Sequence, residues 1–527
     1  MKILITDAIE QQCVDILKAD NLEVTLSPGL EPEQIKKIIP DYDGLIVRSG
    51  TTVTSDIIAA GAKLKVVGRA GAGVDNIDVE AATRKGIIVM NTPGGNTIST
   101  AEHTISMMLA LARNIPQADQ SLKRGEWNRK KFIGMELYEK TLGIVGLGKV
   151  GREVAKRCAS FGMKIIAFDP VLSPDSITEK WIELVPLVEL LKRSDVITVH
   201  TPLTNETRGL IGKGAFKMCK PGVRIVNCAR GGIVDEGALL EALNTGVVGG
   251  AALDVFSTEP PGDHPLLRQP NVIATPHLGA STGEAQEKVA AQIARQVSDA
   301  LYRRRVTGSV NADAIGSAMR PELRPFLSLA EKLGMLVVQL WNGQVKHLTL
   351  RIQGELMNGS SDILCAAFLK GIFSQLLEEP VNYLNAPMIA HERRIHVDVV
   401  KEQGHDVNAN LLTAMYETDK EKRSFSGTVF GQNSIRLVNI DGFHFEANPA
   451  GRLLFYSNID KPGVVAAISS ILSKASINIA GMSLGRYGIG KEALTVMSID
   501  EEIPDTILAE ISAVKGLLGV KTVFLGD

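Results

Sequence analysis

The 527-residue sequence lacks three features, each of which would have pointed to a particular class of protein. Its five cysteines are scattered and show no CxxC spacing. That pattern argues against a disulfide framework, a structural zinc site or another metal centre, and it favours a reducing compartment. The 57 Lys and Arg nearly balance the 59 Asp and Glu, so there is no strong basic field of the kind that binds nucleic acid or an anionic membrane surface.

Long apolar runs are the third absence. No run approaches the roughly 20 residues that a membrane span requires. The N-terminus has neither the basic start nor the extended apolar stretch of a signal peptide. We therefore expect a cytoplasmic protein whose partners include neither membrane nor nucleic acid.

Glycine, in contrast, is plentiful: there are 50, against roughly 37 expected for this length, which predicts many tight turns. Through the first 300 residues, short Val- and Ile-rich runs alternate with amphipathic helical patterns. This order favours parallel sheets with crossover helices. The predicted strands fall into two sets: Ile3–Thr6, Gly44–Val47, Leu64–Gly68 and Ile87–Met90, then Thr141–Leu147, Lys164–Asp169, Val196–His200, Val223–Cys228, Gly250–Asp254 and Val272–Thr275.

The rest of the chain has a different pattern of predicted helices and strands. Ala285–Arg304 is predicted as one long helix that could return to the first set of strands, and Met319–Trp341 as another helix, followed by strand-like stretches up to Ala447. After residue 451 the predicted order is strand, helix, strand, strand, helix, strand, which is the ferredoxin-like βαββαβ arrangement. Its predicted elements are Arg452–Asn458, Val464–Ser473, Ile477–Arg486, Ala493–Asp500, Pro504–Val514 and Val520–Leu525.

A glycine-rich turn at residues 146–151 is the sharpest local motif. Gly146, Gly148 and Gly151 follow an apolar strand and open a helix, and Asp169 ends the next strand. This order is typical of a dinucleotide site, in which glycines permit the turn and the approach of a pyrophosphate. An acid at position 169, followed by Pro170, favours NAD over NADP because a carboxylate repels a 2′-phosphate.

Three reactive side chains each follow a predicted strand of the second set, at the sheet edge where open α/β sheets bind ligands. Arg230 can bind the carboxylate of a 2-oxo acid. Glu259 precedes a Pro-Pro turn, and His277 follows a Pro. A histidine held at one ring nitrogen by a carboxylate can exchange a proton with a substrate hydroxyl at the other.

The segments around these residues, VNCARGGIVDE, DVFSTEPP and PHLGAST, resemble the D-isomer-specific 2-hydroxyacid dehydrogenases. Within that family the sequence is similar to the long-form phosphoglycerate dehydrogenases, including LIVRS, VGRAGAGVDN, NTPGGN and WNRKKF in the first 132 residues. The resemblance covers essentially the whole chain. It implies a substrate lobe (1–97 and 283–311) interrupted by an NAD lobe (98–282), an intervening α+β domain (312–450) and an ACT domain (451–527).

The resemblance also implies roles for individual residues. Arg230, Glu259 and His277 match the family's catalytic trio. The NAD contacts would be Ala72, Gly146, Gly148, Lys149, Val150, Gly151, Asp169, Thr201, Pro202, Cys228, Ala229, Asp254, His277, Leu278, Gly279 and Ala280. Some relatives carry Thr at position 72, where Ala can offer only its backbone amide, and Arg is frequent at position 149.

The implied activity is the NAD-dependent oxidation of 3-phosphoglycerate to 3-phosphohydroxypyruvate by hydride transfer, the first step of serine biosynthesis. Its substrate contacts would be Arg48, Ser49, Arg69, Gly71 and Arg230, with Arg129 (beside Lys130 and Lys131) reaching a neighbouring subunit of a homotetramer. In the ACT domain, a module that binds amino acids between paired copies, Asn458, Asp460 and Asn478 would hold an effector, expected to be L-serine.

Three rival functions stay open at this stage. One is a glyoxylate or hydroxypyruvate reductase of the same fold, which would not need the phosphate selectivity of the added arginines. Another is a nucleotide-sensing co-regulator, although no helix-turn-helix or basic face is evident. The third is an amino-acid-sensing protein with a vestigial dehydrogenase part, which the complete Arg, Glu and His set argues against.

Overall fold

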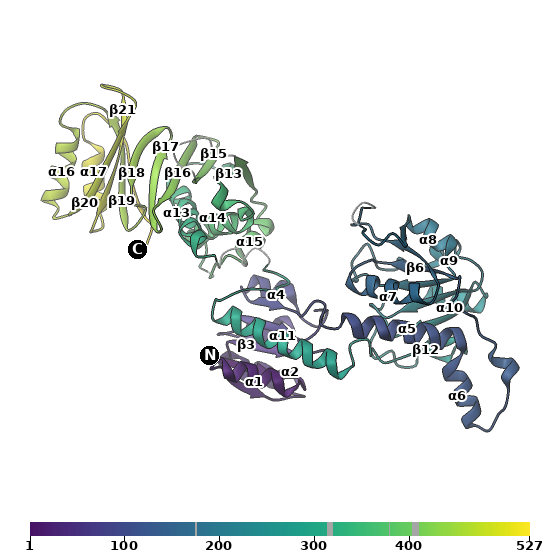
Figure 1. Cartoon of the computed structure of the whole chain (residues 1–527). Helices are drawn as coiled ribbons and strands as arrows, with labels where there is room; N and C mark the ends of the chain where they lie inside the picture. Colours follow the sequence, from purple (N-terminus) through teal and green to yellow (C-terminus); the bar gives the residue numbers. More distant parts are fainter. Residues whose placement is uncertain (174–176, 313–319, 379, 403–409, 527) are drawn as a thin grey trace.

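The computed structural model describes residues 1–173, 177–312, 320–378, 380–402 and 410–526. Within these ranges the strands form four sheets (Figure 1). Two are parallel and Rossmann-like, one is mixed, and the last is antiparallel. The predicted fold class is confirmed.

The first sheet is wholly parallel, with strand order β2-β1-β3-β4-β5. Its core strands are fully buried because helices cover both faces. The short edge strand β2 was not predicted from the sequence. The elements are β1 (Lys2–Ile5), α1 (Gln11–Ala19), β2 (Glu23–Leu26), α2 (Pro32–Ile38), β3 (Gly44–Val47), α3 (Ser55–Ala60), β4 (Val66–Arg69), α4 (Val79–Arg84) and β5 (Ile88–Met90).

The second sheet is also parallel, in the order β12-β11-β10-β9-β6-β7-β8, and the long helix α5 packs into its core. Its edge strand β8 was likewise not predicted. The elements are α5 (Thr97–Arg113), α6 (Ile115–Lys123), β6 (Thr141–Val145), α7 (Lys149–Ser160), β7 (Lys164–Phe168), β8 (Ile182–Leu184), α8 (Leu187–Arg193), β9 (Val196–Val199), α9 (Lys213–Phe216), β10 (Val223–Asn227), α10 (Glu236–Asn244), β11 (Val248–Leu253) and β12 (Val272–Ala274).

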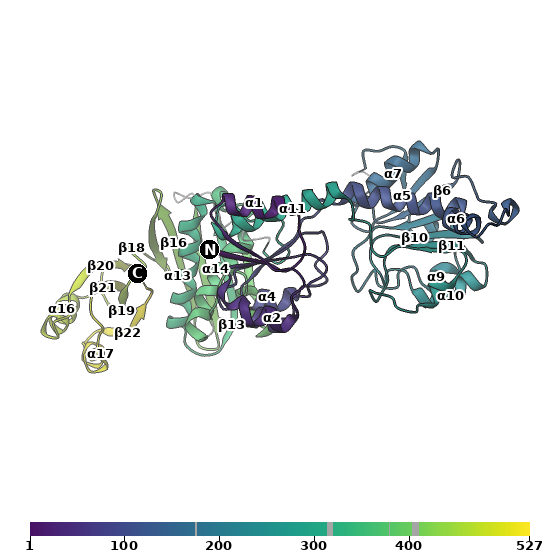
Figure 2. The same cartoon turned by 90° about the horizontal axis from the view of Figure 1, so that it is seen from below.

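Helix α11 (Gly283–Leu301) returns the chain to the first sheet. Its apolar side chains Val289, Ile293 and Val297 belong to the same core as β1, β3 and β4, so the predicted return helix is confirmed. Figure 2 shows α11 and α5 running between the first sheet's lobe and the second. The chain therefore crosses between the two lobes twice.

The third sheet, β14-β13-β15-β16-β17-β18, packs against α13 (Arg324–Leu340) and α14 (Ser361–Leu376). The predicted start of the first helix, Met319, lies outside the described residues. The strand-like stretches predicted after residue 341 are interrupted by two helices that were not located from the sequence, α14 and α15 (Ala386–Glu392). Helix α14 is buried on most sides, which hides the periodicity that would reveal it. The strands are β13 (Val345–Gln353), β14 (Val397–Glu402), β15 (Leu411–Thr418), β16 (Lys422–Phe430), β17 (Ser434–Ile440) and β18 (Phe443–Ala447).

The fourth sheet has the predicted βαββαβ order and the strand arrangement β20-β21-β19-β22. One of its faces shares a hydrophobic core with α13 and α14, to which Leu453, Phe455 and Val523 contribute. The ACT-like module and the preceding unit are therefore packed together across residue 450. The elements are β19 (Arg452–Ile459), α16 (Val464–Lys474), β20 (Ile479–Arg486), β21 (Glu492–Ile499), α17 (Asp505–Ser512) and β22 (Leu517–Phe524).

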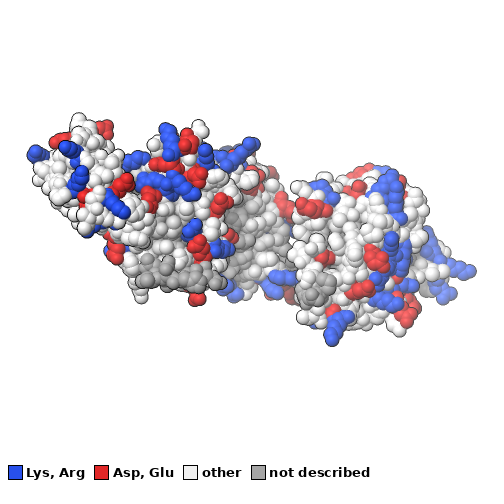
Figure 3. Space-filling model, turned by 90° about the horizontal axis from the view of Figure 1, so that it is seen from above, with Lys and Arg blue, Asp and Glu red and all other residues white. Residues whose placement is uncertain are grey.

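Two further features of the fold are the distribution of charged side chains and the apolar character of the helices. On the face shown in Figure 3, cationic and anionic side chains are interspersed rather than gathered by sign. Among the described residues, no helix combines the length and apolar character needed to cross a bilayer.

Candidate active site

The turn between β6 and α7 shows why glycine is needed at two of its positions. Gly146 has a left-handed φ of +94°, and a Cβ there would lie 2.7 Å from the backbone oxygen of His200. A Cβ on Gly151 would lie 2.2 Å from the oxygen of Gly146, so helix and turn meet backbone to backbone. Gly148 differs, since a Cβ there would meet nothing within 4 Å. Its face is open to a ligand.

The groups around this turn fit a dinucleotide. Helix α7 starts immediately after Gly148, which offers no side-chain cap to the first N–H groups of the helix. Those groups and the helix dipole favour phosphate. Asp169 accepts a hydrogen bond from the N–H of Leu147 at 2.9 Å, which holds its carboxylate beside the turn. Among the described residues, the buried Thr201 hydroxyl has no partner and is free to bond a ligand.

A cavity of about 710 Å³ lies between the first two lobes. The first lobe lines it with residues 48–49 and 69–73, and the second with segments that follow β10, β11 and β12. Ten of the residues predicted to bind cofactor or substrate, or to act in catalysis, line this cavity: Arg48, Ser49, Arg69, Gly71, Ala72, Arg230, Asp254, Glu259, His277 and Ala280.

His277 and Glu259 form a close pair in this cavity. The Nδ1 atom of His277 lies 2.7 Å from Oε2 of Glu259. Burial raises the pKa of Glu259, but hydrogen bonds from His277 and from the N–H of Phe256 outweigh it and hold the pKa below its usual range. The carboxylate is therefore ionised at neutral pH and can only accept. Consequently, His277 carries a proton on Nδ1 and presents Nε2 to the cavity.

Arg230 contacts the first lobe across the cavity. Its Nε donates to Oδ2 of Asp75 at 3.0 Å, and its Nη1 donates to the backbone oxygen of Ala229 at 2.7 Å. The buried amide of Asn227 shapes this turn by donating to the oxygen of Arg230 and accepting from the N–H of Ala229. The guanidinium is thus fixed at the cavity wall, with Nη2 still available to an anion.

Arg69 and Arg48 line the same wall. Burial, then the positive charge of Arg230 and, less strongly, that of Arg48, lowers the pKa of Arg69 from its usual value. Asn76 holds both segments, accepting from Nε of Arg69 at 2.8 Å and donating to the backbone oxygen of Arg48 at 2.7 Å. Three guanidinium groups that repel one another indicate a site for a strongly anionic ligand.

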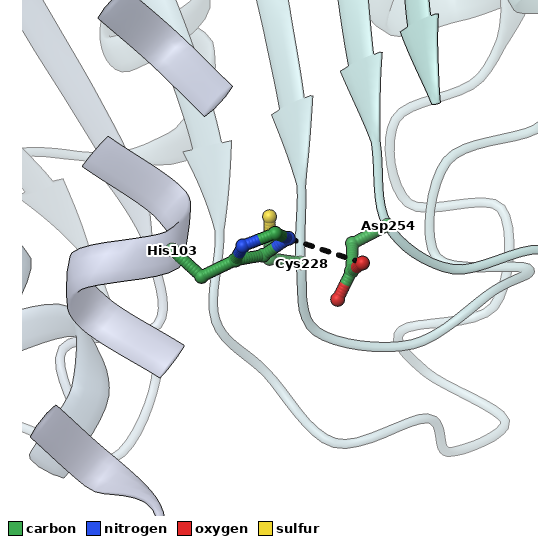
Figure 4. Close-up of side chains that lie close together, drawn as sticks. All are labelled: His103, Cys228 and Asp254. Carbon is green, nitrogen blue, oxygen red and sulfur yellow. Dashed lines mark ion pairs between the residues drawn. The ribbon is translucent and has the colours of Figure 1, made fainter. Parts of the chain in front are cut away.

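His103 and Cys228 lie beside Asp254, which lines this cavity (Figure 4), and the ligand atoms of the three residues are all within 4.8 Å of one another. Burial raises the pKa of the Cys228 thiol to about 12, which disfavours the thiolate that a metal needs. The Asp254 carboxylate already accepts hydrogen bonds at both oxygens. Within the cluster, Nε2 of His103 lies 3.1 Å from Oδ1 of Asp254, and the buried thiol and the occupied carboxylate argue against a metal centre.

The other predicted cofactor residues lie around the turn and the loop ends. Lys149 is exposed, and its Nζ lies 3.1 Å from where a Cβ on Gly94 would be. Arg129 is exposed in a short 3₁₀ helix (Arg129–Phe132) and does not line this chain's cavity. Of the rest, Val150 and Ala229 are half-buried, Gly279 is buried, and Pro202 and Leu278 are exposed.

The structure does not bring the three predicted effector residues together within one chain. Asn458 and Asp460 lie at the end of β19, where Asn458 pairs in register with Ala493. Asn478 lies at the opposite end, because the neighbouring Ile479 pairs with Ile499, the partner of Arg452. The buried Oδ1 of Asn458 has no partner among the described residues, whereas Asp460 accepts from Arg486 at 2.9 Å.

Sequence reasoning missed several supporting residues. Asp75 and Asn76 lie in the GVDN segment used for the resemblance, but nothing local links them to Arg230 or Arg69. Asn227 directly precedes Cys228 on a buried strand, where a polar side chain signals a specific hydrogen-bonding role. His103 and Thr275 gave no signal, since their contact joins residues 172 positions apart.

Comparisons with known proteins agree with this geometry. A family model for the NAD binding domain of D-isomer specific 2-hydroxyacid dehydrogenases matches residues 105–279. The D-3-phosphoglycerate dehydrogenase intervening domain matches 322–441, and the ACT domain matches 452–516. The fold and the site thus define an NAD-binding 2-hydroxyacid dehydrogenase.

Full-length relatives narrow the assignment. D-3-phosphoglycerate dehydrogenase from Methanocaldococcus jannaschii is 44% identical and spans 100% of both chains. The Homo sapiens enzyme of that name is 43% identical over 95% of this chain and 96% of its own. The chain belongs to the D-3-phosphoglycerate dehydrogenase family.

Solved structures match the first two lobes. An NAD-dependent formate dehydrogenase from Staphylococcus aureus in complex with NAD is 31% identical, with a TM-score of 0.54, over 58% of this chain and 97% of that one. A glyoxylate reductase from Paecilomyes thermophila is also 31% identical, with a TM-score of 0.54, over 59% of this chain and 98% of that one.

Proposed function

We propose that the chain oxidises 3-phospho-D-glycerate to 3-phosphohydroxypyruvate with NAD, as the first step of serine biosynthesis. The observation that best supports this proposal is that His277, paired with Glu259, lies in one interlobe cavity with Arg48, Arg69 and Arg230. That arrangement supplies a proton acceptor and anion binders, and the same lobe that carries His277 also carries the open turn at Gly148.

The residues of this chain divide the work as follows. Glu259 fixes the tautomer of His277, whose Nε2 takes the proton of the substrate's C2 hydroxyl during oxidation and returns it during reduction. Arg230 binds the carboxylate next to that carbon. Gly148, the N-terminus of α7, Asp169 and the Thr201 hydroxyl would hold NAD, which supplies the hydride acceptor when bound.

Arg48 and Arg69 set the preference for a phosphorylated substrate. They line the same cavity as Arg230 but belong to the first lobe. Binding of one anion to arginines from both lobes would draw the cavity closed and exclude water. A glyoxylate reductase needs no second anionic subsite, and the relative of that name matches only 59% of this chain.

The direct test compares NADH oxidation by the full chain with 3-phosphohydroxypyruvate, glyoxylate and 2-oxoglutarate. We expect the highest kcat/KM with the phosphorylated substrate, and we expect Arg69→Met to lower that value while changing glyoxylate reduction much less. Equal kcat/KM values for phosphohydroxypyruvate and glyoxylate would reject the proposed substrate.

We further propose that L-serine binds between two copies of the ACT domain. Asn458 offers a buried acceptor without a partner, and Asp460 offers a carboxylate suited to an ammonium group. Because Asn478 lies at the other end of the strand, it could complete the site only on a second copy. Point variants test this better than deletion of 452–527, since Leu453 and Val523 support the preceding domain.

L-serine should therefore inhibit the wild-type chain, and Asn458→Ala and Asn478→Ala should each weaken that inhibition at least about tenfold with kcat unchanged. An exposed ACT residue, Lys515→Ala, is the control. Inhibition that both asparagine variants retain would place the effector elsewhere.

We also propose that the chain is a cytoplasmic homotetramer. The segment after α6 exposes large apolar side chains, including Trp127 at 75% and Ile133 at 80%, beside the exposed Arg129. A second copy that covered this segment could receive Arg129 in its cavity. Sedimentation of the wild type and of Trp127→Ser tests the assembly, and a monomeric wild type would contradict it.

A further inference from the structure

The buried carboxylate of Asp254 collects four hydrogen-bond donors. Asp254 ends β11 and is 1% exposed. Its Oδ1 accepts from the N–H of Leu278 at 2.7 Å and from the Thr275 hydroxyl at 2.5 Å, and it lies 3.1 Å from Nε2 of His103. Its Oδ2 accepts from the N–H of Gly279 at 2.9 Å. The same Nε2 of His103 forms a hydrogen bond of 3.2 Å with the Thr275 hydroxyl oxygen. Burial raises the pKa of Asp254, but these donors outweigh it and hold the pKa below its usual range.

Two of these donors belong to the loop that carries the reactive histidine. His277 adopts a left-handed φ of +56°, which is unfavourable for a residue with a side chain. Its own N–H donates to the backbone oxygen of Asp254 at 2.9 Å, and the next two N–H groups donate to the Asp254 carboxylate. Asp254 therefore holds the loop conformation that directs the His277 ring.

The beginning of α5 holds the same loop from the other side. The hydroxyls of Ser99 and Thr100 donate to the backbone oxygen of Gly279 at 2.9 and 3.1 Å. His103, one turn further along the helix and 18% exposed, points its ring at Asp254 (Figure 4). Since an ionised carboxylate can only accept, Nε2 of His103 carries the proton that it donates.

We propose that His103 is a positioning residue for the reaction. Its Nε2 contacts both the Asp254 carboxylate and the Thr275 hydroxyl that donates to that carboxylate, and so fixes the carboxylate. The carboxylate in turn fixes the backbone of residues 277–279 and so the direction of the His277 ring. This inference rests on the proposed role of His277 in proton transfer. It adds a residue that makes no contact with the cavity but on which the geometry of the reactive imidazole depends.

The observations favour this role over a metal centre formed by His103, Cys228 and Asp254. A metal ion would need Asp254 lone pairs that now accept from the loop N–H groups, and it would need the Cys228 thiolate, which burial disfavours. As a hydrogen-bond donor, His103 can be replaced by an amide. As a metal ligand, it could not be replaced in this way.

The test compares His103→Leu, which removes the donor, with His103→Gln, which keeps a donor at similar reach. Ser106→Ala, an exposed position one turn along α5, is the control. We expect His103→Leu to lower kcat at least about tenfold, because small misplacements of a reactive group are costly. NADH binding, followed by fluorescence, should change less than threefold, and His103→Gln should recover kcat to within about threefold of the wild type.

A second readout does not depend on turnover. Amide hydrogen exchange at Leu278 and Gly279 should be at least about tenfold faster in His103→Leu than in the wild type and near normal in His103→Gln. If the wild type reduces no 2-oxo acid, the proposed function fails while this exchange measurement still decides the role of His103. Thr275→Val, which removes another donor to the same carboxylate, should move both readouts in the same direction.

Three results would overturn the proposal. The first is His103→Leu with kcat within twofold of the wild type and unchanged exchange. The second is equal loss in the Leu and Gln variants, which would assign the effect to the imidazole ring itself. The third is loss of wild-type activity on chelation with recovery on adding Zn²⁺, which would make the cluster a metal centre.

Discussion

Replacing Glu259 by Gln tests whether the negative charge of Glu259 supports proton transfer by His277. The change keeps the size of the side chain but removes the charge that lies 2.7 Å from Nδ1 of His277. Since the pKa of Glu259 is held below its usual range, the carboxylate is ionised and the wild-type contact is charged throughout the neutral range. His277 gains a positive charge when it takes the substrate proton. The carboxylate therefore stabilises the reacting state more than the resting one.

The size of the effect follows from the hydrogen bond. A hydrogen bond to a charged group contributes about 1.5–3 kcal/mol and a neutral one about 0.5–1.5 kcal/mol, so removing the charge costs about 1–1.5 kcal/mol, or about tenfold in kcat. The side chains of His277 and Glu259 are 45% and 38% exposed, so solvent screens part of the charge, and loss of the charge alone should cost no more than about tenfold in kcat. A glutamine can also donate to Nδ1 and select the wrong tautomer, which can cost up to about 10⁴-fold.

The assay is steady-state NADH oxidation with 3-phosphohydroxypyruvate near pH 7.5, with NADH binding measured separately. The matched control is Glu183→Gln, which breaks an exposed pair with Arg193 on the same lobe, outside the cavity lining. We expect kcat to fall severalfold, up to about tenfold, in Glu259→Gln from loss of the charge, and further where the glutamine selects the wrong tautomer; kcat should stay within twofold in the control. A Glu259→Gln variant with wild-type kcat would refute the assigned role of the carboxylate.

Three further predictions concern the cofactor lobe. Asp169→Ala should weaken NAD binding and raise the NADP/NAD ratio of kcat/KM, and an unchanged ratio would reject its contact with the ribose. Gly151→Ala should unfold the turn, because its Cβ would lie 2.2 Å from the oxygen of Gly146. Gly148→Ala should keep the wild-type melting temperature but weaken NADH binding, because a Cβ there meets no protein atom within 4 Å. Normal NADH binding in Gly148→Ala would place the cofactor elsewhere. Burial lowers the pKa of His200 to about 4, whereas the pKa of this residue in the unfolded chain is near 6.5, so the unfolded chain binds a proton first as the pH falls. The folded state should therefore lose about 2 kcal/mol of stability between pH 7 and 5. In His200→Gln the melting temperature should depend correspondingly less on pH.

The local parts of the fold could be predicted from the sequence. The glycines at 146, 148 and 151, the acid at 169 and the strand–helix order lie within 24 residues, so each supports the others. His277 and Glu259 could be assigned because each follows a strand of one parallel sheet, whose carboxyl ends meet at a single edge.

The parts that could not be predicted depend on contacts between distant segments. Asp75 pairs with Arg230, which lies 155 residues further along the chain and on the other lobe. Nothing in the sequence around His103 distinguishes it from other residues of an amphipathic helix, because its contact with Asp254 forms only when the chain is folded. Helix α14 is buried on most sides, so its sequence shows no helical stripe. The hydrophobic core that the intervening unit shares with the C-terminal βαββαβ unit could not be predicted either. The sequence between the two units, Asn-Pro-Ala-Gly, resembles a linker, yet the units pack against each other.

The central claim is that His277 performs the proton transfer in a cavity that binds cofactor independently of it. Its most direct test is the single-turnover rate of NADH oxidation by His277→Ala with saturating 3-phosphohydroxypyruvate, measured on enzyme whose NADH affinity is determined in the same preparation. We predict NADH affinity within about threefold of the wild type and a rate at least about a hundredfold lower. A rate close to that of the wild type, with NADH bound normally, would contradict the account.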